Sequence, residues 1–274
     1  MNIDLDTGKL WVFLGGFAFF FLLETVLPAR PFVDRWRRLG FHALLALLNT
    51  VLVRVLVYVP MLLWTVYVEE EGWGLSRWLG LWGPVEILAS IVVLDFFDYL
   101  WHRGNHRIRF LWRFHKAHHA DTAMDIGTAL RFHPGELLIS SLVKALWVLV
   151  WGPTVLAWFL FEALVSLCAQ FHHSNIDFPD GVERWLSWIV VTPRFHATHH
   201  AVDRRYGDAN FSTILSLWDP LFGTRADAPA EERARWRAEG IGLPEARESA
   251  FSLRAWIEEP FRRRNLELPP GSHT

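Results

Sequence analysis

Five long apolar stretches lie along the first two thirds of the chain, separated by shorter polar segments. They cover residues 10–27, 41–68, 79–101, 137–151 and 154–171. A helix needs roughly 20 apolar residues to cross a hydrocarbon core of roughly 30 Å. The first three stretches are therefore predicted to span a membrane.

The last two stretches are separated by Gly152-Pro153, a pair that is typical of a tight break between two helices. They are predicted to form a helical hairpin. Its first arm has about 15 residues, or roughly 22 Å, which is short for a full crossing. The pattern predicts an all-α integral membrane protein with three to five transmembrane helices.

The charges of the loops orient these helices. Segment 29–40 carries four arginines, whereas the loop after the second stretch carries three consecutive glutamates and only Arg77. Short loops rich in Lys and Arg face the cytoplasm. From that orientation, the third stretch ends at His102 and the hairpin returns at His172 on the same, cytoplasmic side. A helical cap on that side is expected.

Composition agrees with a membrane location and excludes several functions. The chain is 52% hydrophobic and contains 16 Trp and 21 Phe, which is too apolar for an ordinary soluble domain. A formal net charge of −2 argues against nucleic acid as a partner. The single cysteine, Cys168, excludes a disulfide within the chain, a Cys-cluster zinc site and a CxxCH haem attachment.

Histidines are concentrated in one part of the chain. Eleven of the 13 lie between His102 and His200, and eight of these form three boxes, at 102–106, 115–119 and 196–200. Residues at i, i+3 and i+4 of a helix share one face, so each box is expected to present its imidazoles to a common point. Eight imidazoles exceed the ligand set of one zinc ion and indicate two metal ions. Imidazole suits zinc, copper, iron and nickel, so the residue types leave the metal open.

Two acidic residues precede the first box on the same helical stripe. Asp98 is four residues before His102, and Asp95 is three residues earlier still. A carboxylate at that position can accept the second ring N–H of a metal-bound imidazole and fix its tautomer. Asp98 is therefore expected to support His102.

Together, these motifs resemble the fatty acid hydroxylase/sterol desaturase superfamily of membrane di-iron oxygenases. The resemblance is strongest over residues 95–224. It rests on the three histidine boxes and on four further segments, which are Asp95 to His102, Arg131 to Glu136, His173 to Asn175, and Trp218 to Thr224. It implies a membrane-embedded histidine-box hydroxylase domain over 1–224. From Arg225 onward the composition changes to charged residues and proline, which predicts a charged, solvated cytoplasmic C-terminal tail over 225–274.

The resemblance also implies a set of metal ligands. Nine histidines are expected to ligate two irons: His102, His106, His115, His118, His119, His173, His196, His199 and His200. His172 neighbours the family position and replaces or assists His173, with His173 favoured. His133 is followed by Pro134, which favours a structural or supporting role. Asn175 is expected to hold a water or to support the site.

The activity implied by the resemblance is O₂-dependent hydroxylation of an unactivated C–H bond in a lipid. The chain has no GxGxxG motif after a strand, no P-loop and no haem or iron–sulfur cysteine motif. No tightly bound nucleotide or haem is therefore expected. Electrons are expected from another protein, such as a cytochrome b5-like protein or a ferredoxin with its reductase.

Two alternatives stay open at this stage. Desaturation would use the same site, and the motifs do not separate it from hydroxylation. A membrane metal carrier is an alternative of another class, although transport favours ligands at the bilayer midplane. The lipid itself, whether acyl chain, sterol, sphingoid base, ether lipid or carotenoid, is not fixed by the motifs.

Besides Asp95 and Asp98, the apolar stretches contain the ionisable residues Glu24, Arg54, Glu86, Lys144 and Glu162. Burial of charge in lipid is costly, which makes such residues candidates for function. Pairing between helices is the simpler expectation, with Lys144 and Glu162 facing each other across the hairpin. His42 and His273 lie outside the histidine pattern and are expected to be bystanders.

Overall fold

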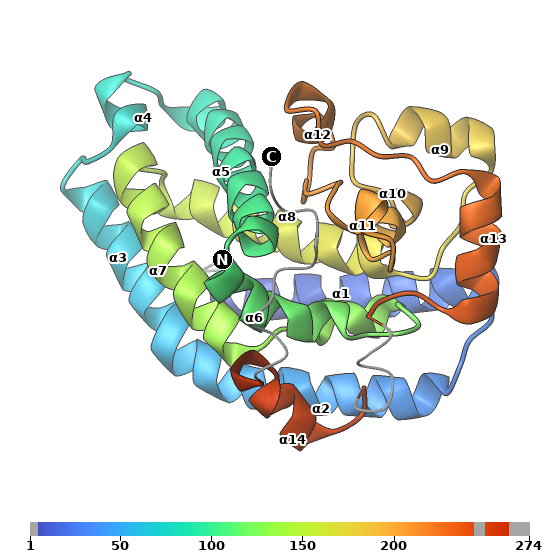
Figure 1. The fold of residues 1–274 in the computed structure, drawn as a ribbon. Helices are drawn as coiled ribbons and strands as arrows, with labels where there is room; N and C mark the ends of the chain where they lie inside the picture. The colour runs from blue at the N-terminus through green and yellow to red at the C-terminus, as the bar shows by residue number, and fades with distance from the viewer. Residues whose placement is uncertain (1–4, 244–249, 263–274) are drawn as a thin grey trace.

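The computed structural model describes residues 5–243 and 250–262 (Figure 1). The regular structure of these residues is helical, as predicted, and their strand pairing is limited to two isolated bridges, Pro28 with Ile176 and Val190 with Leu215. The side chain of Arg54 and all of His273 lie outside the described residues.

The first part of the chain forms the long helices. They are α1 (Leu5–Val26), α2 (Arg35–Val53) with the π-helical turn η1 (Arg54–Tyr58), α3 (Val59–Glu70), the short α4 (Leu75–Trp78), α5 (Gly83–Arg107), α6 (Arg109–His119), the 3-10 turn η2 (Ile126–Leu130), α7 (Pro134–Trp151) and α8 (Val155–His173).

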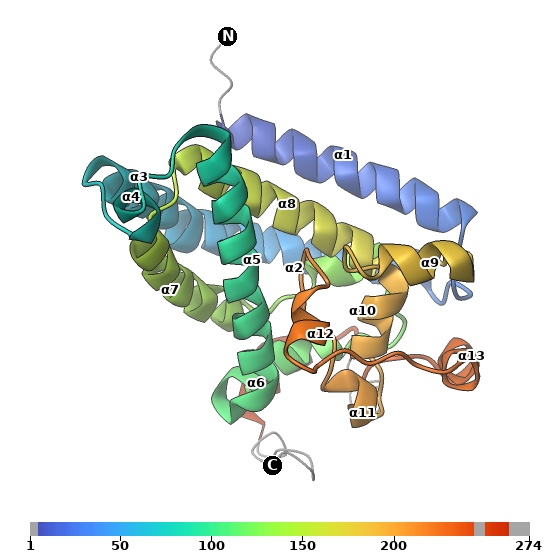
Figure 2. The ribbon, with the colours of Figure 1, turned by 90° about the horizontal axis from the view of Figure 1, so that it is seen from above.

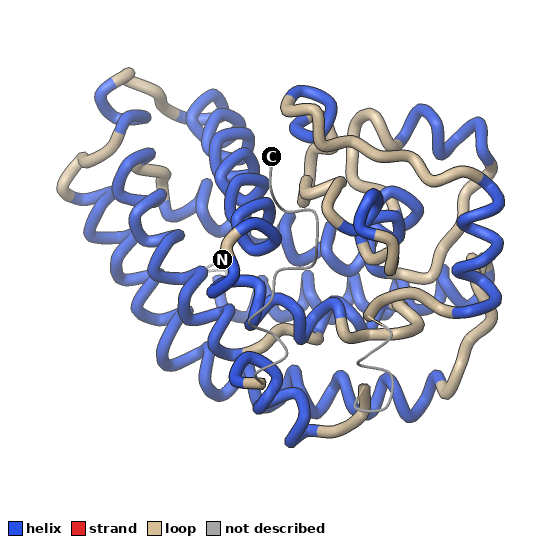
Figure 3. The backbone as a smooth tube through the Cα atoms, viewed as in Figure 1, coloured by secondary structure: helices blue, strands red, loops and turns tan. Residues whose placement is uncertain are grey.

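Shorter elements follow. They are α9 (Asp180–Leu186), α10 (Pro193–His199), α11 (Arg204–Gly207), α12 (Trp218–Leu221), α13 (Ala230–Glu239), α14 (Leu253–Glu258) and the 3-10 turn η4 (Glu259–Phe261). Figure 3 shows that the longer loops are concentrated in this part of the chain.

Three of the described helical segments are long and apolar enough to cross a membrane: Gly8–Val26 in α1, α7 and α8. Such segments indicate a membrane protein. The second predicted span is a pair of helical segments, Arg35–Leu52 and Val55–Trp78, bent by 41° relative to each other. Helices bend where the i→i−4 ladder is interrupted, and the π-helical turn η1 stands at this break.

The third predicted span behaves differently. It forms α5, which is long enough to cross but is not among the helices apolar enough to do so. Glu86, Asp95 and Asp98 are buried in the protein. Because Glu86 accepts hydrogen bonds from Ser90 Oγ and from the backbone N–H and hydroxyl of Thr154, its charge faces protein groups rather than lipid.

The predicted hairpin is confirmed. Gly152 ends α7 in the left-handed conformation at φ 71°, and the Thr154 hydroxyl caps α8 by accepting a hydrogen bond from the Ala157 N–H. The first arm has 18 residues rather than about 15, because the helix begins already at Pro134. Lys144 Nζ lies 2.8 Å from Glu162 Oε1, as expected for a pair across the hairpin.

Helix α8 occupies the middle of the bundle. It packs against α1 along its length, against α5, and against α10 near its C-terminus (Figures 1 and 2). The short helices after α8 gather around the C-terminal ends of α5 and α8 (Figure 2). The elements that carry the three histidine boxes therefore meet at one end of the bundle.

The end of α1 and the start of α2 are fixed to the residues that follow α6. The Arg38 guanidinium is buried against the carboxylates of Asp121 and Asp125. Glu24 Oε2 accepts hydrogen bonds from the backbone N–H groups of Ile126 and Asn175, at 3.1 and 2.9 Å. These contacts place residues 119–126, directly after the second box, against the N-terminal helices.

The described residues after 225, which are 226–243 and 250–262, do not form the solvated tail expected from the composition. Trp236, Ile241 and Trp256 are buried. The Gly242 N–H donates to the His200 carbonyl, and the Leu243 N–H donates to the His119 carbonyl. At Gly242, with φ 82°, a Cβ atom would collide with the Asp121 carbonyl, so only glycine allows this approach. This segment closes over the boxes from outside.

Candidate metal centre

The histidines form two groups. The five-histidine group consists of His102, His106, His115, His119 and His199, and the four-histidine group consists of His118, His173, His196 and His200. In each group, one possible ligand atom per residue lies within 4.8 Å of all the others. These nine residues are the nine that the family resemblance implied.

The second and third boxes each contribute to both groups, which differs from the expectation of one common point per box. In the second box, His115 and His119 belong to the five-histidine group and His118 to the four-histidine group. In the third box, His199 belongs to the five-histidine group, and His196 and His200 belong to the four-histidine group. At 100° per residue, the i+3 position lies about 60° to one side of the first histidine and the i+4 position about 40° to the other. An HxxHH box is therefore suited to link two neighbouring ions.

The distances between ring nitrogens fit metal coordination. In the four-histidine group, His173 Nε2 lies 3.0 Å from both His118 Nε2 and His196 Nε2, and His200 Nε2 lies 3.2 Å from His196 Nε2. Two nitrogens bound at roughly 2.1 Å to one ion, 90–109° apart, are separated by roughly 3.0–3.4 Å. In the five-histidine group, His115 Nε2 and His119 Nε2 lie 3.2 Å apart.

The opposite ring nitrogens of several of these histidines bind protein acceptors. The Nδ1 atoms of His102, His173 and His199 lie 2.7–2.8 Å from the carbonyl oxygens of Phe211, Ala169 and Ala209, respectively. His115 Nδ1 lies 2.7 Å from Glu136 Oε1. An Nδ1–H that donates to such an acceptor leaves the Nε2 lone pair free to bind a metal.

Burial keeps seven of these imidazoles uncharged. Removal from water, with smaller contributions from neighbouring histidines, holds the pKa well below its ordinary value for six of the residues, which are His102, His106, His118, His119, His196 and His200. Burial also lowers the pKa of His199 to about 3. Metals bind neutral imidazole, so the groups are ready as ligands at neutral pH.

The donor set fits metal ions, since two of its inward nitrogens have no other partner. His106 Nε2 and His199 Nε2 are buried and make no hydrogen bond. Buried nitrogens of this kind are costly unless something binds them. Both nitrogens belong to the five-histidine group, and the convergence of ligand atoms shows that each of the two groups could hold a metal ion. Imidazole donors suit iron as well as zinc, copper and nickel.

Two further histidines lie beside these groups. The His172 ring is centred 4.1 Å from that of His196, but His172 belongs to neither group. His133 caps α7, where its Nδ1 accepts a hydrogen bond from the Gly135 N–H, and its ring packs against Phe114 and Trp256. The structure gives His133 a structural role.

The expected contact of Asp98 with His102 is not found. His102 Nδ1 binds the Phe211 carbonyl rather than Asp98, whose Oδ1 instead lies 3.8 Å from Lys144 Nζ on α7. Asn175 exchanges hydrogen bonds with the backbone of Arg30. It thus fixes the α1–α2 connection to the end of α8, which is a structural contact.

Two carboxylates hold the loop that supports the site. Asp95 accepts hydrogen bonds from the N–H groups of Ile214 and Leu215 and from Trp218 Nε1. Asp219 accepts from the N–H groups of Phe211 and Ser212 and from the Thr224 hydroxyl. Sequence reasoning placed Asp219 in a motif without giving it a role.

Glu136 offers a test of the support given to the ligands. Its Oε1 is the acceptor for His115 Nδ1, and substitutions of such partners cost roughly 10- to 100-fold in metal affinity or activity. Glu136→Gln is expected to weaken metal binding within that range, because an amide oxygen is a weaker acceptor than a carboxylate. Competition with a chelator measures the affinity. An unchanged affinity would refute this role for Glu136.

A cavity of about 450 Å³ reaches the histidines from the helical bundle. Helices α1, α5, α7 and α8 supply most of its walls, and α6, η2, α10 and neighbouring loops supply the rest. The lining includes His102, His115, His118, His173 and His196 together with apolar side chains such as Phe13, Leu137 and Val165. The two groups of histidines therefore border a space between membrane-spanning helices.

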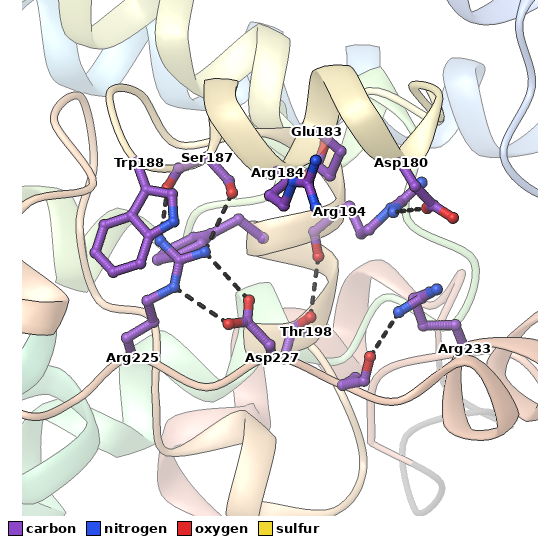
Figure 4. Close-up of a pocket in the computed structure, with 12 residues that line it drawn as sticks. Asp180, Glu183, Arg184, Ser187, Trp188, Arg194, Thr198, Arg225, Asp227 and Arg233 are labelled. Carbon is purple, nitrogen blue, oxygen red and sulfur yellow. Dashed lines mark hydrogen bonds and ion pairs between the residues drawn. The ribbon is translucent and has the colours of Figure 1, made fainter.

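A second cavity, of about 230 Å³, lies on the outer side of α10 (Figure 4). Its arginines are largely bound within the protein: Arg194 pairs with Asp177 and Asp180. Arg225 pairs with Asp227 and lies over the rings of Trp188 and Phe195. The ion pairs of Arg194 and the packing of Arg225 on Phe195 brace α10, whose inner side carries His196 and His199.

Comparison with known proteins identifies the family. The model of the fatty acid hydroxylase family matches residues 87–224, about half of the chain. The chain belongs to this family, as its motifs indicated. No solved structure shows a significant match to it.

Named relatives include lipid hydroxylases and monooxygenases. The chain is 25% identical to ornithine lipid hydroxylase OlsE of Rhizobium tropici over 271 residues, covering 94% of the chain and 78% of the relative. It is 31% identical to human alkylglycerol monooxygenase over 137 residues, covering 50% and 29%. It is 26% identical to mouse cholesterol 25-hydroxylase over 149 residues, covering 53% and 48%. The match therefore spans less than a third of the alkylglycerol monooxygenase and about half of the cholesterol hydroxylase.

Proposed function

We propose that this protein is a membrane-bound di-iron monooxygenase that hydroxylates an unactivated C–H bond of a lipid. The observation that carries the proposal is the pair of buried histidine groups bordering a cavity between membrane-spanning helices. Family membership and the names of the relatives support the reaction class.

The nine histidines would hold the two irons, five residues at one and four at the other. When bound there, such a pair supplies the activation of O₂ that insertion of an oxygen atom into a C–H bond requires. The carbonyls of Phe211, Ala169 and Ala209 and the carboxylate of Glu136 would keep the ligand rings in place.

The cavity supplies binding and exclusion of water. Phe13, Leu137, Val165 and Ala169 provide apolar walls along which a hydrocarbon chain can lie. Because the walls belong to α1, α7 and α8, which are apolar enough to span a membrane, a lipid would reach the histidines from the bilayer.

Electrons would come from a separate protein, because the sequence has no nucleotide-binding motif. The family resemblance favours a cytochrome b5-like protein or a ferredoxin with its reductase. We place the histidine boxes and the C-terminal segment on the cytoplasmic side, as the arginines of segment 29–40 indicate.

The test combines metal analysis, oxygen uptake and lipid analysis. Purified protein is expected to contain two irons per chain and to consume O₂ only when a reductant and an electron-transfer protein are supplied. Cells that express the protein are expected to gain a lipid heavier by one oxygen atom. Loss of two hydrogens would indicate the desaturase alternative, and tight zinc without oxygen consumption would indicate the metal carrier.

A further inference from the structure

The cavity has a charged region that begins at Asp98, one helical turn before His102, and extends away from the histidines along α8. Lys9 of α1, Asp98 of α5, Lys144 of α7 and Glu162 of α8 all line it. We refer to these four residues as the charged cluster. Glu162 is eleven residues before His173 on the same helix, which corresponds to roughly 16 Å along the helix axis.

Ion pairs of unequal length connect the members of the charged cluster, and Lys9 also lies over the rings of Tyr58 and Trp158. Lys144 Nζ lies 2.8 Å from Glu162 Oε1, but 3.8 Å from Asp98 Oδ1, and Lys9 Nζ lies 3.8 Å from Glu162 Oε2. The side chains of Lys9, Lys144 and Glu162 keep 20–27% of their surface exposed. Charges among membrane-spanning helices are costly and mark functional sites.

Several oxygens on the cavity wall lack a donor. Asp98 Oδ1, Asn105 Oδ1 and Gln170 Oε1 are buried and make no hydrogen bond, and all three residues line the cavity. The Asp98 side chain as a whole is 9% exposed. Carboxylate and amide oxygens can only accept hydrogen bonds. A ligand that carries hydrogen-bond donors is therefore complementary to this cavity.

We propose that the charged cluster binds the polar end of the lipid substrate, and that this end carries a hydrogen-bond donor, a hydroxyl or an ammonium group, which binds Asp98. This proposal rests on the proposed function. The hydrocarbon part of the substrate then extends along α8 toward His173, past Val165 and Ala169.

Binding of four probes with the same chain tests this assignment: 1-hexadecanol, hexadecylamine, palmitate and hexadecane. Native mass spectrometry of the purified full chain in detergent counts the probe bound per protein. The alcohol, the amine or both are expected to bind about tenfold or more tightly than hexadecane, because they bond to a buried charged acceptor. Which of the two binds tighter identifies the donor group.

Two substitutions of Asp98 locate the effect. Asp98→Ala is expected to remove the preference for donors while hexadecane binding stays unchanged. Asp98→Asn, which keeps an oxygen acceptor without charge, is expected to retain the preference for the alcohol and to weaken that for the amine. Ser141→Ala is the matched control, because Ser141 lies on α7 beside the cavity-lining Ser140 but bonds to the Leu138 carbonyl.

Three outcomes would overturn the proposal: equal binding of all four probes to the wild type, preference for palmitate, or an unchanged preference in Asp98→Ala. Binding does not require turnover, so it is measured whether or not iron and oxygen uptake are found. A donor preference in a protein without iron-dependent activity would refute the proposed function alone. Normal activity with no donor preference would refute this inference alone.

Discussion

His173→Ala is expected to lose bound metal and to reduce turnover by more than roughly 100-fold, because loss of a group that only supports a ligand already costs up to roughly 100-fold. His172→Ala is expected to keep the metal. The two histidines are adjacent at the end of α8, but their surroundings differ. His173 Nε2 lies 3.0 Å from two other ring nitrogens, and its Nδ1 is bound to the Ala169 carbonyl. His172 Nδ1 makes no hydrogen bond, and His172 belongs to neither group.

Metal per chain, measured by mass spectrometry on the purified variants, separates the two. His172→Ala serves as the matched control for burial and for loss of one imidazole at this helix end. Because His172 also lines the cavity, the turnover of the His172→Ala variant is a weaker readout than the metal content of that variant. Retention of two metals by His173→Ala, or loss of metal by His172→Ala, would contradict the ligand sets proposed here.

The sequence predicted which histidines gather, but not how they divide. Spacing at i, i+3 and i+4 predicts a shared helix face, and His115, His118 and His119 do share one. Their split between two groups depends on rotations of about 40–60° around α6 and on which helix faces each side. That information lies in the packing of α6 against α5, α8 and α10, which no local spacing contains.

The acceptor for His102 shows a second limit. Asp98 has the right helical spacing, yet the Phe211 carbonyl takes the hydrogen bond. A backbone carbonyl leaves no signature in a sequence, because every residue has one. The position of the Phe211 carbonyl depends on Asp95 and Asp219, which accept hydrogen bonds from the surrounding loop. In the sequence, Asp95 lies 116 positions before Phe211 and Asp219 lies eight positions after it.

The membrane topology was predictable in part for a similar reason. The hairpin followed from Gly152-Pro153 and two apolar arms. In contrast, residues 79–101 were predicted to span the membrane, but the acidic residues of this stretch are buried against protein. The arginines used to orient the chain also have partners, since Arg35 pairs with Glu24, Arg38 with Asp121, and Arg30 with the Met124 carbonyl. They therefore serve packing as well as charge asymmetry.

Asp219→Ala is expected to lower the free energy of unfolding by about 3 kcal/mol or more, since each buried donor left unpaired costs about 1–3 kcal/mol. Three donors lose their acceptor: the Phe211 and Ser212 N–H groups and the Thr224 hydroxyl. The Tyr99 hydroxyl, 3.0 Å from Thr224 Oγ1, is disturbed as well. Denaturation in detergent measures the change.

The same substitution is expected to weaken metal binding, because Phe211 supplies the carbonyl that holds His102. Asp219→Asn keeps one oxygen acceptor and should therefore lose less stability and less metal affinity than Asp219→Ala. Asp227→Ala is the matched control: Asp227 lies in the same part of the chain, but its side chain is 74% exposed and it pairs only at the surface with Arg225, so a change within about 0.5 kcal/mol is expected. If Asp219→Ala matched Asp227→Ala in stability and iron content, the 209–224 loop would not be what positions His102. The ring would then have to be held by its neighbours in the five-histidine group alone.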